Sequence, residues 1–434
     1  MKKLISIIFM LVILSSQLYA QVQRFPKPDF ESGYEQPVPD QPLPRAAAWN
    51  TIDIAVLFLT LSLVSWLVIK KRSRKGIFSV MLFSLLYFGF FRKGCICPVG
   101  SVQNMVLSIF DPGYIIPVVV IAFFSLPLIF ALFYGRTFCA GVCPLGALQD
   151  VIGLKPIKLP AWLERTLGIL PIAYLGFAIL FAATGAGFIV CRFDPFVGIF
   201  RRGMNAGMFV WSMSVLLIGV FVARPYCRFL CPYGVLLGWM SRLSRRHVTI
   251  TPAECINCHL CADSCPYGAI NGPAPDKYPG EYRTEKWKFT TLVLAIPIAM
   301  LIGAWSLSQM SVILSRSHPV VRTAEQIRLE DTGRVDYTTD ASDAFRGTGE
   351  PVASLYARAA AIQKQFKTGT RILGAFLALM IMLRIINLYM WRRRDGYETD
   401  KGNCLSCGRC IATCPIEHER LAELKGEPIV ERAG

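Results

Sequence analysis

The sequence predicts an all-α membrane bundle of about six or seven spans, joined to a small α+β module that is rich in cysteine. Hydrophobic residues make up 53% of the 434-residue chain and charged residues only 17%, against about 25% charged in soluble domains. Several apolar runs are long enough to cross a bilayer. The 15 cysteines are concentrated in short motifs, which favours metal ligation over a disulfide framework.

The start of the chain has the pattern of a targeting segment. It has a basic tip, a short apolar stretch and a small residue, Ala20, before Gln21. We expect a signal peptide or an uncleaved anchor over 1–20. The Pro-rich residues 21–50 are then expected to form an extracytoplasmic linker.

Apolar runs of bilayer-crossing length follow this linker. They lie near residues 51–70, 114–134, 167–190, 206–223, 289–310 and 370–390. The shorter run 76–91 either spans the membrane with local thinning or re-enters it. Counting it as a span places the basic segment Lys70–Lys75 and the tail after Trp391 on one face. The positive-inside rule assigns that face to the cytoplasm.

These spans divide the chain into expected segments. A transmembrane bundle covers 51–245, and two further spans cover 286–310 and 370–390, with an extracytoplasmic segment over 311–369 between them. The formal net charge of +17 is explained by basic residues that flank the spans. Membrane lipid is therefore an expected partner, and nucleic acid is not.

Two cysteine motifs carry the strongest chemical signal. CINCHLCADSCP, at Cys255–Pro266, and CLSCGRCIATCP, at Cys404–Pro415, both have the spacing C-x2-C-x2-C-x3-C-P. This is the bacterial ferredoxin pattern for a 4Fe-4S cluster. Structural zinc sites generally use separated C-x2-C pairs instead. The sequence therefore predicts two 4Fe-4S clusters.

In a paired ferredoxin, the fourth cysteine of each motif usually ligates the cluster of the other motif. We therefore expect the module to be assembled from two halves, 246–285 and 391–434, on the cytoplasmic side. The expected ligands of the first cluster are Cys255, Cys258, Cys261 and Cys414, and those of the second are Cys404, Cys407, Cys410 and Cys265. Ligation within each motif is the alternative.

The histidines disfavour haem. CINCH also matches the c-type haem attachment pattern, but its cysteines already belong to the longer motif. Haem within the bundle needs axial histidines inside the spans. The histidines, all in polar segments or motifs, are His247, His259, His318 and His418. No haem is expected.

Further cysteines lie at the edges of the apolar runs. CAGVCPLG and CRFLCPYG place Cys139, Cys143, Cys227 and Cys231 at the cytoplasmic ends of their spans, as a candidate third cluster or redox dithiols. Cys95, Cys97 and Cys191 are expected towards the opposite face, with Asp194 as a candidate fourth ligand. An arginine precedes each Cys-Pro-x-Gly motif (Arg92, Arg136 and Arg224) and is expected to offset negative charge. Alternatively, these cysteines pack as small buried hydrophobes.

The two Cys-x3-Cys-Pro motifs and the two ferredoxin motifs together resemble the membrane polyferredoxins of the NapH and NosR type and, more distantly, CcoG proteins. The resemblance covers about residues 51–270 and 391–416. It implies a multi-pass protein of the bacterial inner membrane with two cytoplasmic 4Fe-4S clusters. It also implies, as partners, the quinone pool and a redox protein such as a periplasmic flavoprotein or reductase. NosR proteins carry a flavin domain before their spans. Here a short Pro-rich segment without a flavin attachment signature stands in that place, so no covalent flavin is expected.

The favoured function is an electron-transfer subunit that relays electrons between the quinol pool or a cytoplasmic donor and an extracytoplasmic acceptor. No catalytic residue is assigned, and a stand-alone enzyme is not expected. The alternative is an assembly or maturation factor that reduces a metal or cofactor for another, copper-containing enzyme. A transporter is disfavoured because charged residues within the spans are nearly absent apart from Arg384.

Overall fold

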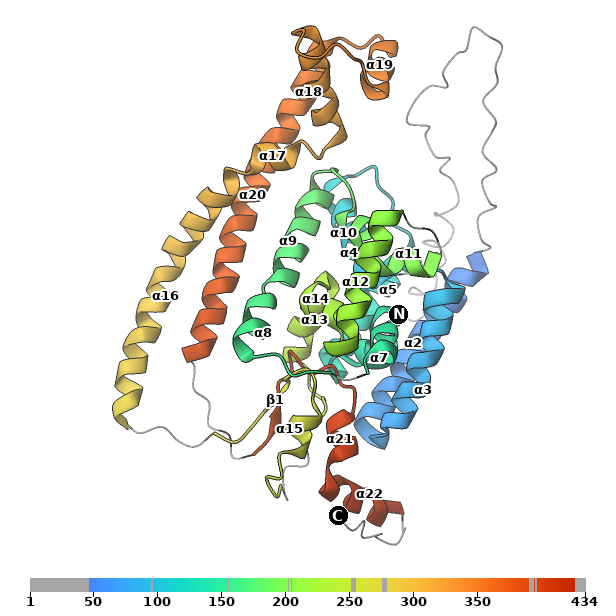
Figure 1. Ribbon diagram of the computed structural model, residues 1–434, viewed down its shortest axis with the longest axis vertical. Helices are drawn as coiled ribbons and strands as arrows, with labels where there is room; N and C mark the ends of the chain where they lie inside the picture. The colour runs from blue at the N-terminus through green and yellow to red at the C-terminus, as the bar shows by residue number, and fades with distance from the viewer. Residues whose placement is uncertain are drawn as a thin grey trace, which may run out of the picture. The chain divides into compact units, whose positions relative to one another are not determined.

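The computed structural model describes residues 47–94, 97–154, 156–201, 203, 205–250, 255–274, 279–389, 394 and 396–425. The expected signal peptide or anchor and nearly all of the expected linker lie outside these residues. The described chain is mostly helical, with a single two-stranded sheet among its described residues (Figure 1).

Within the described residues, four helical stretches are long and apolar enough to cross a bilayer. The first, Ala48–Lys71, consists of α2 (Ala47–Trp66) and η2 (Leu67–Lys71), and the second, Arg74–Phe91, consists of α3 (Arg74–Ser84) and η3 (Leu85–Phe91). The third, Lys286–Ser308, lies in α16 (Pro279–Ser308). The fourth, Val352–Asn387, lies in α20 (Val352–Tyr389). A bent pair, α11 (Pro195–Arg201) and α12 (Ala206–Phe221), makes a fifth if it counts as one span. The sequence predicts six or seven. The difference lies in α5 (Val118–Tyr134) and α9 (Leu170–Ala183), which are apolar but shorter.

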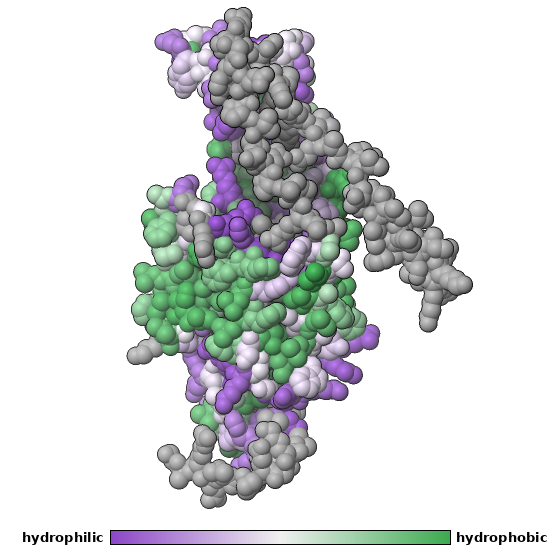
Figure 2. All heavy atoms as spheres, turned by 90° about the vertical axis from the view of Figure 1, so that its right-hand side faces the viewer, coloured by the Kyte–Doolittle hydropathy of each residue, from purple (hydrophilic) through white to green (hydrophobic). Residues whose placement is uncertain are grey.

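Apolar side chains form a belt around the bundle. Figure 2 shows this belt across the middle of the described chain, with hydrophilic side chains on both sides of it. Large side chains in the apolar helices face outward, as Leu59, Leu217 and Leu301 do, the last with 72% of its surface exposed. Such a continuous exposed apolar surface is stable only in contact with lipid. The protein is therefore a membrane protein.

The bundle has two distinguishable ends. At the module end, a Cβ placed on Gly135 would lie 3.4 Å from the Ser406 hydroxyl oxygen of the second ferredoxin motif. At the far end, a Cβ on Gly185 would lie 3.8 Å from His318 Nε2. The far end also carries three short helices, α17 (Ser311–Ser315), α18 (Pro319–Asp331) and α19 (Asp340–Gly347). The first part of α20 packs on α18 there, and together they enclose a small core.

Four short segments fold back into the bundle, and we call them re-entrant hairpins. From the module end come α6 (Thr137–Gly141) with α7 (Pro144–Ile152), and α13 (Pro225–Phe229) with α14 (Pro232–Arg242). From the far end come α10 (Ile189–Phe193) with α11, and α4 (Pro98–Phe110). Helices α4, α7, α11 and α14 all begin with proline, which is preorganised for the first helical position and holds the residue before it in an extended conformation.

The α+β module is built from two distant parts of the chain. The first half holds α15 (Leu260–Ser264) and β1 (Ile270–Asn271). The second half holds β2 (Glu398–Thr399), α21 (Arg409–Thr413) and α22 (Pro415–Lys425). β1 and β2 are antiparallel, with Ile270 opposite Thr399. The Asp400 N–H also donates to the Ala269 carbonyl at 2.8 Å.

A long helical hairpin, α16 with α20, connects the two halves of the module. Its helices cross closely at Gly303 and Gly374, where a Cβ on Gly374 would lie only 2.1 Å from the Gly303 carbonyl oxygen. Glycine at both positions allows this backbone contact. Helix α20 runs without a break through residues 369 and 370, where the sequence analysis divides an outer segment from a span. The remaining helix, α8 (Ala161–Leu167), lies before α9.

Candidate iron–sulfur sites

The first group of thiols lines a pocket in the module. Its lining includes Cys255, Cys258, Cys261 and Cys414, together with His259 and Tyr397. Three of these cysteines come from the first motif and the fourth from the second, across the contact between α15 and α21. This is the grouping that the exchange of fourth cysteines predicts.

The second group takes three cysteines from the second motif and one from the first. Cys404, Cys407 and Cys410 lie within electrostatic range of one another and of Cys265 from the first motif. Burial raises the pKa of the Cys404 thiol to about 12. A free thiol here would stay protonated at neutral pH, whereas a coordinating metal deprotonates it outright.

Each group supplies four cysteines, which is the donor set of a 4Fe-4S cluster. Among the described residues, no three His, Cys, Asp or Glu side chains form a group that could hold a metal ion. A structural zinc site needs four ligands around one centre. The cysteines of a 4Fe-4S cluster each bind a different iron and therefore lie further apart. The donor sets present thus suit clusters.

The two motif loops share an unusual backbone. Asn257 and Ser406, each two residues after the first cysteine of its motif, have φ angles of 53° and 54°. His259 and Gly408, two residues further on, have φ angles of 64° and 72°. Side chains other than glycine rarely adopt this left-handed region, and where they do the strain often marks a functional site. The two motif loops therefore have equivalent backbone conformations.

The two thiol groups differ in their relation to the membrane bundle. Cys407 is 9% exposed, and Cys265, Cys404 and Cys410 pack against the main hydrophobic core of the bundle. Arg74 of α3 donates to the Cys407 carbonyl at 2.9 Å. The first group is more open, and its Cys258 is exposed. The Cys404 group therefore adjoins the bundle, and the Cys255 group faces outward.

One buried carboxylate joins the bundle to both halves of the module. Asp150, near the end of α7, pairs with Arg224 at 3.1 Å and with Arg74 at 3.2 Å. It also accepts from Tyr267 of the first half at 3.2 Å and pairs with Arg409 of the second half at 3.4 Å. No local sequence pattern identifies Asp150, because its partners are up to 259 residues away along the chain.

The arginines that precede the Cys-Pro motifs mainly bind other groups. Arg92 pairs with Asp53, Arg136 donates to the Gly402 carbonyl of the module at 3.2 Å, and Arg224 pairs with Asp150. Two of the three therefore lie where the bundle meets the module. Arg136 and Arg224 are still within electrostatic range of the Cys227 thiol.

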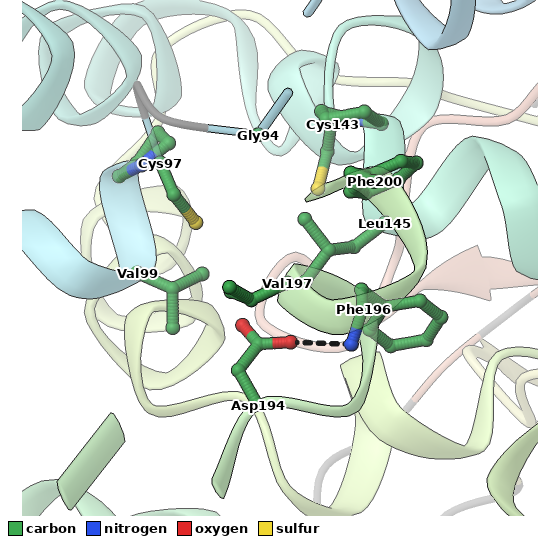
Figure 3. Close-up of a pocket in the computed structure, with 11 residues that line it drawn as sticks. Gly94, Cys97, Val99, Cys143, Leu145, Asp194, Phe196, Val197 and Phe200 are labelled. Carbon is green, nitrogen blue, oxygen red and sulfur yellow. Dashed lines mark hydrogen bonds between the residues drawn. The ribbon is translucent and has the colours of Figure 1, made fainter. Parts of the chain in front are cut away.

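The cysteines at the membrane edge come together inside the bundle. Cys143 lies within electrostatic range of Cys139, Cys227 and Cys231, as the sequence analysis expects. Gln149 donates to Cys227 Sγ at 3.3 Å. Cys97, which the sequence assigns to a separate set, lines the same pocket as Cys143 (Figure 3). The re-entrant hairpins explain this, because they carry thiols inward from both ends.

The structure places the other members of the opposite-face set, Cys95, Cys191 and Asp194, in different ways. Cys95 lies outside the described residues. Cys191 is exposed but lies within electrostatic range of Cys97 and Asp194, as the sequence predicts. Asp194 lines the pocket with Cys97 and Cys143. One sequence signal ties Asp194 to the other motifs. Asp194–Pro195 repeats the Cys-Pro step that precedes α4, α7 and α14.

These features define a membrane protein with iron–sulfur binding domains, and the comparisons agree. A family model described as a 4Fe-4S binding domain matches residues 116–169 and 204–251, each of which contains one Cys-x3-Cys-Pro motif. A second model with the same description matches residues 248–271. These matches and the relatives below support the similarity of the chain to NapH/NosR-type 4Fe-4S membrane proteins.

Three curated relatives illustrate the family. Protein NirI of Paracoccus denitrificans is 29% identical over 232 residues, covering 50% of this chain and 34% of the relative. Regulatory protein NosR of Pseudomonas aeruginosa is 28% identical over 243 residues, covering 50% of this chain and 32% of the relative. Methylamine utilization ferredoxin-type protein MauN of Paracoccus denitrificans is 31% identical over 156 residues, covering 34% of this chain and 55% of the relative. The chain thus spans about a third to about half of the length of these relatives. No solved structure matches the chain.

Proposed function

We propose that the protein relays electrons through the membrane, from a donor at the module to an acceptor beyond the far end of the bundle. The observation that supports this proposal most is that the Cys404 group packs against the bundle core, whereas the Cys255 group includes the exposed Cys258. One-electron transfer is the chemistry that a 4Fe-4S cluster supplies when bound. A donor has access to the outer group, and the inner group borders the bundle.

The proposed ligands follow the exchanged grouping. Cys255, Cys258, Cys261 and Cys414 hold the outer cluster, and Cys404, Cys407, Cys410 and Cys265 hold the inner one. The Ser406 N–H donates to Cys404 Sγ at 3.4 Å, which stabilises a thiolate and tunes the reduction potential of a cluster. Ile256 and Leu260 beside Cys258 are exposed and give a donor protein an apolar contact surface.

The contacts of the basic loop support a cytoplasmic module. Lys70–Lys75 is the loop that the positive-inside rule assigns to the cytoplasm. Arg72 in this loop pairs with Glu417 of the module at 2.8 Å, and Arg74 contacts Cys407. The proposed donor is therefore a cytoplasmic reductant or the quinol pool, and the proposed acceptor is an extracytoplasmic redox protein. The membrane is then the bacterial inner membrane.

The proposal is tested with proteoliposomes that trap ferricyanide, a membrane-impermeant electron acceptor. Dithionite is added outside, and loss of ferricyanide absorbance is followed. We expect the protein to accelerate reduction at least several-fold over empty liposomes. Cys407→Ala removes an inner ligand and should abolish this gain. A rate equal to that of empty liposomes for the iron-loaded protein would overturn the proposal.

A further inference from the structure

We propose that Cys97, Cys143, Cys231 and Asp194 bind a third iron–sulfur cluster inside the membrane bundle. This set differs from the four membrane-edge cysteines that the sequence groups together. It takes only the second cysteine of each of those motifs, and it adds two donors that enter from the far end. The proposed cluster would extend the electron route of the previous section into the bundle.

The first support is a shared pocket. Figure 3 shows the Cys97 and Cys143 thiols and the Asp194 carboxylate pointing into it from different segments. Of the four proposed ligands, Cys97, Cys143 and Asp194 line this pocket, and Cys231, like Cys139 and Cys227, lies outside its lining.

The second support is a common local geometry. Each proposed ligand immediately precedes the proline that starts a re-entrant helix, and backbone N–H groups of the first turn face its side chain. The Gly234 N–H donates to Cys231 Sγ at 3.3 Å, and the Phe196 N–H donates to Asp194 Oδ1 at 2.8 Å. The N–H groups of Gly100 and Gly146 likewise face Cys97 and Cys143. Such N–H contacts are the ones that tune cluster-bound sulfur.

The third support concerns how Cys231 joins the site. A Cβ on Gly146 would lie 3.2 Å from Arg224, and a Cβ on Gly234 would lie 3.2 Å from Arg136. Each module-end hairpin thus makes room, with its Pro-x-Gly glycine, for the arginine that precedes the other hairpin. This reciprocal packing brings the two hairpin tips together. Cys231 accordingly lies within electrostatic range of Cys97.

The fourth support is an uncompensated buried charge. Asp194 is 2% exposed and accepts from the Phe196 N–H and from the Tyr226 hydroxyl at 3.4 Å. No basic side chain in the described ranges forms an ion pair with it. A buried carboxylate without a cation is costly, and buried charges are generally paired or coordinate metals. Coordination to an iron of the cluster would give this carboxylate a metal partner.

Helix capping alone offers a competing explanation of Asp194. Aspartate is a favoured N-cap residue, and the bond from Phe196 fits that role. Capping does not explain why the three equivalent positions are cysteine, which is not a favoured cap. Asparagine caps as well as aspartate. Asp194→Asn therefore separates the two roles, because it keeps the cap and removes the charged ligand.

The test is iron and acid-labile sulfide per protein after anaerobic purification, with EPR of the reduced samples. Two ferredoxin clusters account for about eight irons, and we expect about twelve in the wild type. Asp194→Asn and Cys143→Ala should each lower the count to about eight, and Asp194→Cys should restore about twelve. Cys139→Ala, a matched change at a cysteine outside the proposed ligand set, should leave the count unchanged. Cys407→Ala reports on the ferredoxin clusters separately, because it should remove about four irons whatever the bundle holds.

Two results would overturn the proposal. The first is a wild-type count of about eight that Asp194→Asn leaves unchanged. The second is a loss of iron in Cys139→Ala but not in Asp194→Asn. That result would assign the cluster to Cys139, Cys143, Cys227 and Cys231 instead.

Discussion

The guanidinium of Arg224 lies 3.1 Å from the carboxylate of Asp150, and the two side chains are 0% and 3% exposed. Arg224 begins the second module-end hairpin, and Asp150 lies near the end of the first. Because Asp150 also contacts Tyr267 and Arg409, this one pair fastens both hairpins to both halves of the module. The position of the inner thiol group against the bundle therefore depends on it.

Asp150→Asn should destabilise the protein strongly. It leaves the buried Arg224 without its counter-charge, and breaking a buried pair in this way costs about 3–5 kcal/mol. We expect a lower free energy of unfolding in denaturant titrations in detergent, and weaker retention of iron in the Cys404 group. The control is Glu350→Gln, which removes an exposed pair with Arg358 and should cost at most about 1 kcal/mol. Equal effects of the two substitutions would contradict the role given to Asp150.

Gly374→Leu should separate α16 from α20. Any Cβ at this position meets the Gly303 carbonyl oxygen, a backbone atom that cannot rotate away. Overpacking of this kind typically costs about 1–3 kcal/mol, and here it also misaligns the two module halves that the hairpin connects. Thermal unfolding in detergent and iron content measure both effects. Gly347→Leu is the matched control, because nothing lies within 4 Å of a Cβ there. A wild-type melting temperature for Gly374→Leu would refute the close crossing.

The far-end helices should lose stability in acid. Burial alone would raise the pKa of Glu330, but hydrogen bonds from Gln326 and Ser342 and the charge of Arg346 outweigh it and lower the pKa. A carboxyl group with a lowered pKa stabilises the fold above its unfolded pKa, and this contribution is lost as the pH falls through the folded value. We expect wild-type α18 and α19 to be better protected than those of Glu330→Gln at neutral pH.

Hydrogen exchange of peptides from these two helices, compared between wild type and variant at the same pH, measures this difference. Comparison at one pH removes the intrinsic pH dependence of exchange. The advantage of the wild type should shrink once the carboxyl group is protonated. A difference that stays constant from neutral to acid pH would show that the charge of Glu330 does not stabilise these helices.

The iron–sulfur motifs of this protein could be predicted from its sequence. The spacing of Cys255, Cys258 and Cys261 is a short-range pattern that specifies one cluster loop, and a second copy of it indicates a pair. Counting the spans between the copies also predicts that Cys414 meets the first group. The resemblance to NapH/NosR-type proteins is confirmed by the family models and relatives.

The interior of the bundle could not be predicted in the same way. Hydropathy averages over windows longer than the re-entrant hairpins, so Cys97 and Cys143 are assigned to opposite membrane faces although they line one pocket. Asp150 and Arg409 are far apart in sequence, and no local pattern pairs them. The sequence signal that links Asp194 to the cysteines is the proline after it. Asp194–Pro195 matches the Cys-Pro dipeptides before α4, α7 and α14, with aspartate in place of cysteine.

The central claim is that each ferredoxin cluster draws ligands from both halves of the module, and iron counts of double variants test it most directly. Cys258→Ala combined with Cys414→Ala should lose about four irons, no more than either change alone. Cys258→Ala combined with Cys265→Ala should lose about eight. The opposite result, about eight irons lost from the first pair and about four from the second, would contradict the account, because it would mean that each motif binds its own cluster.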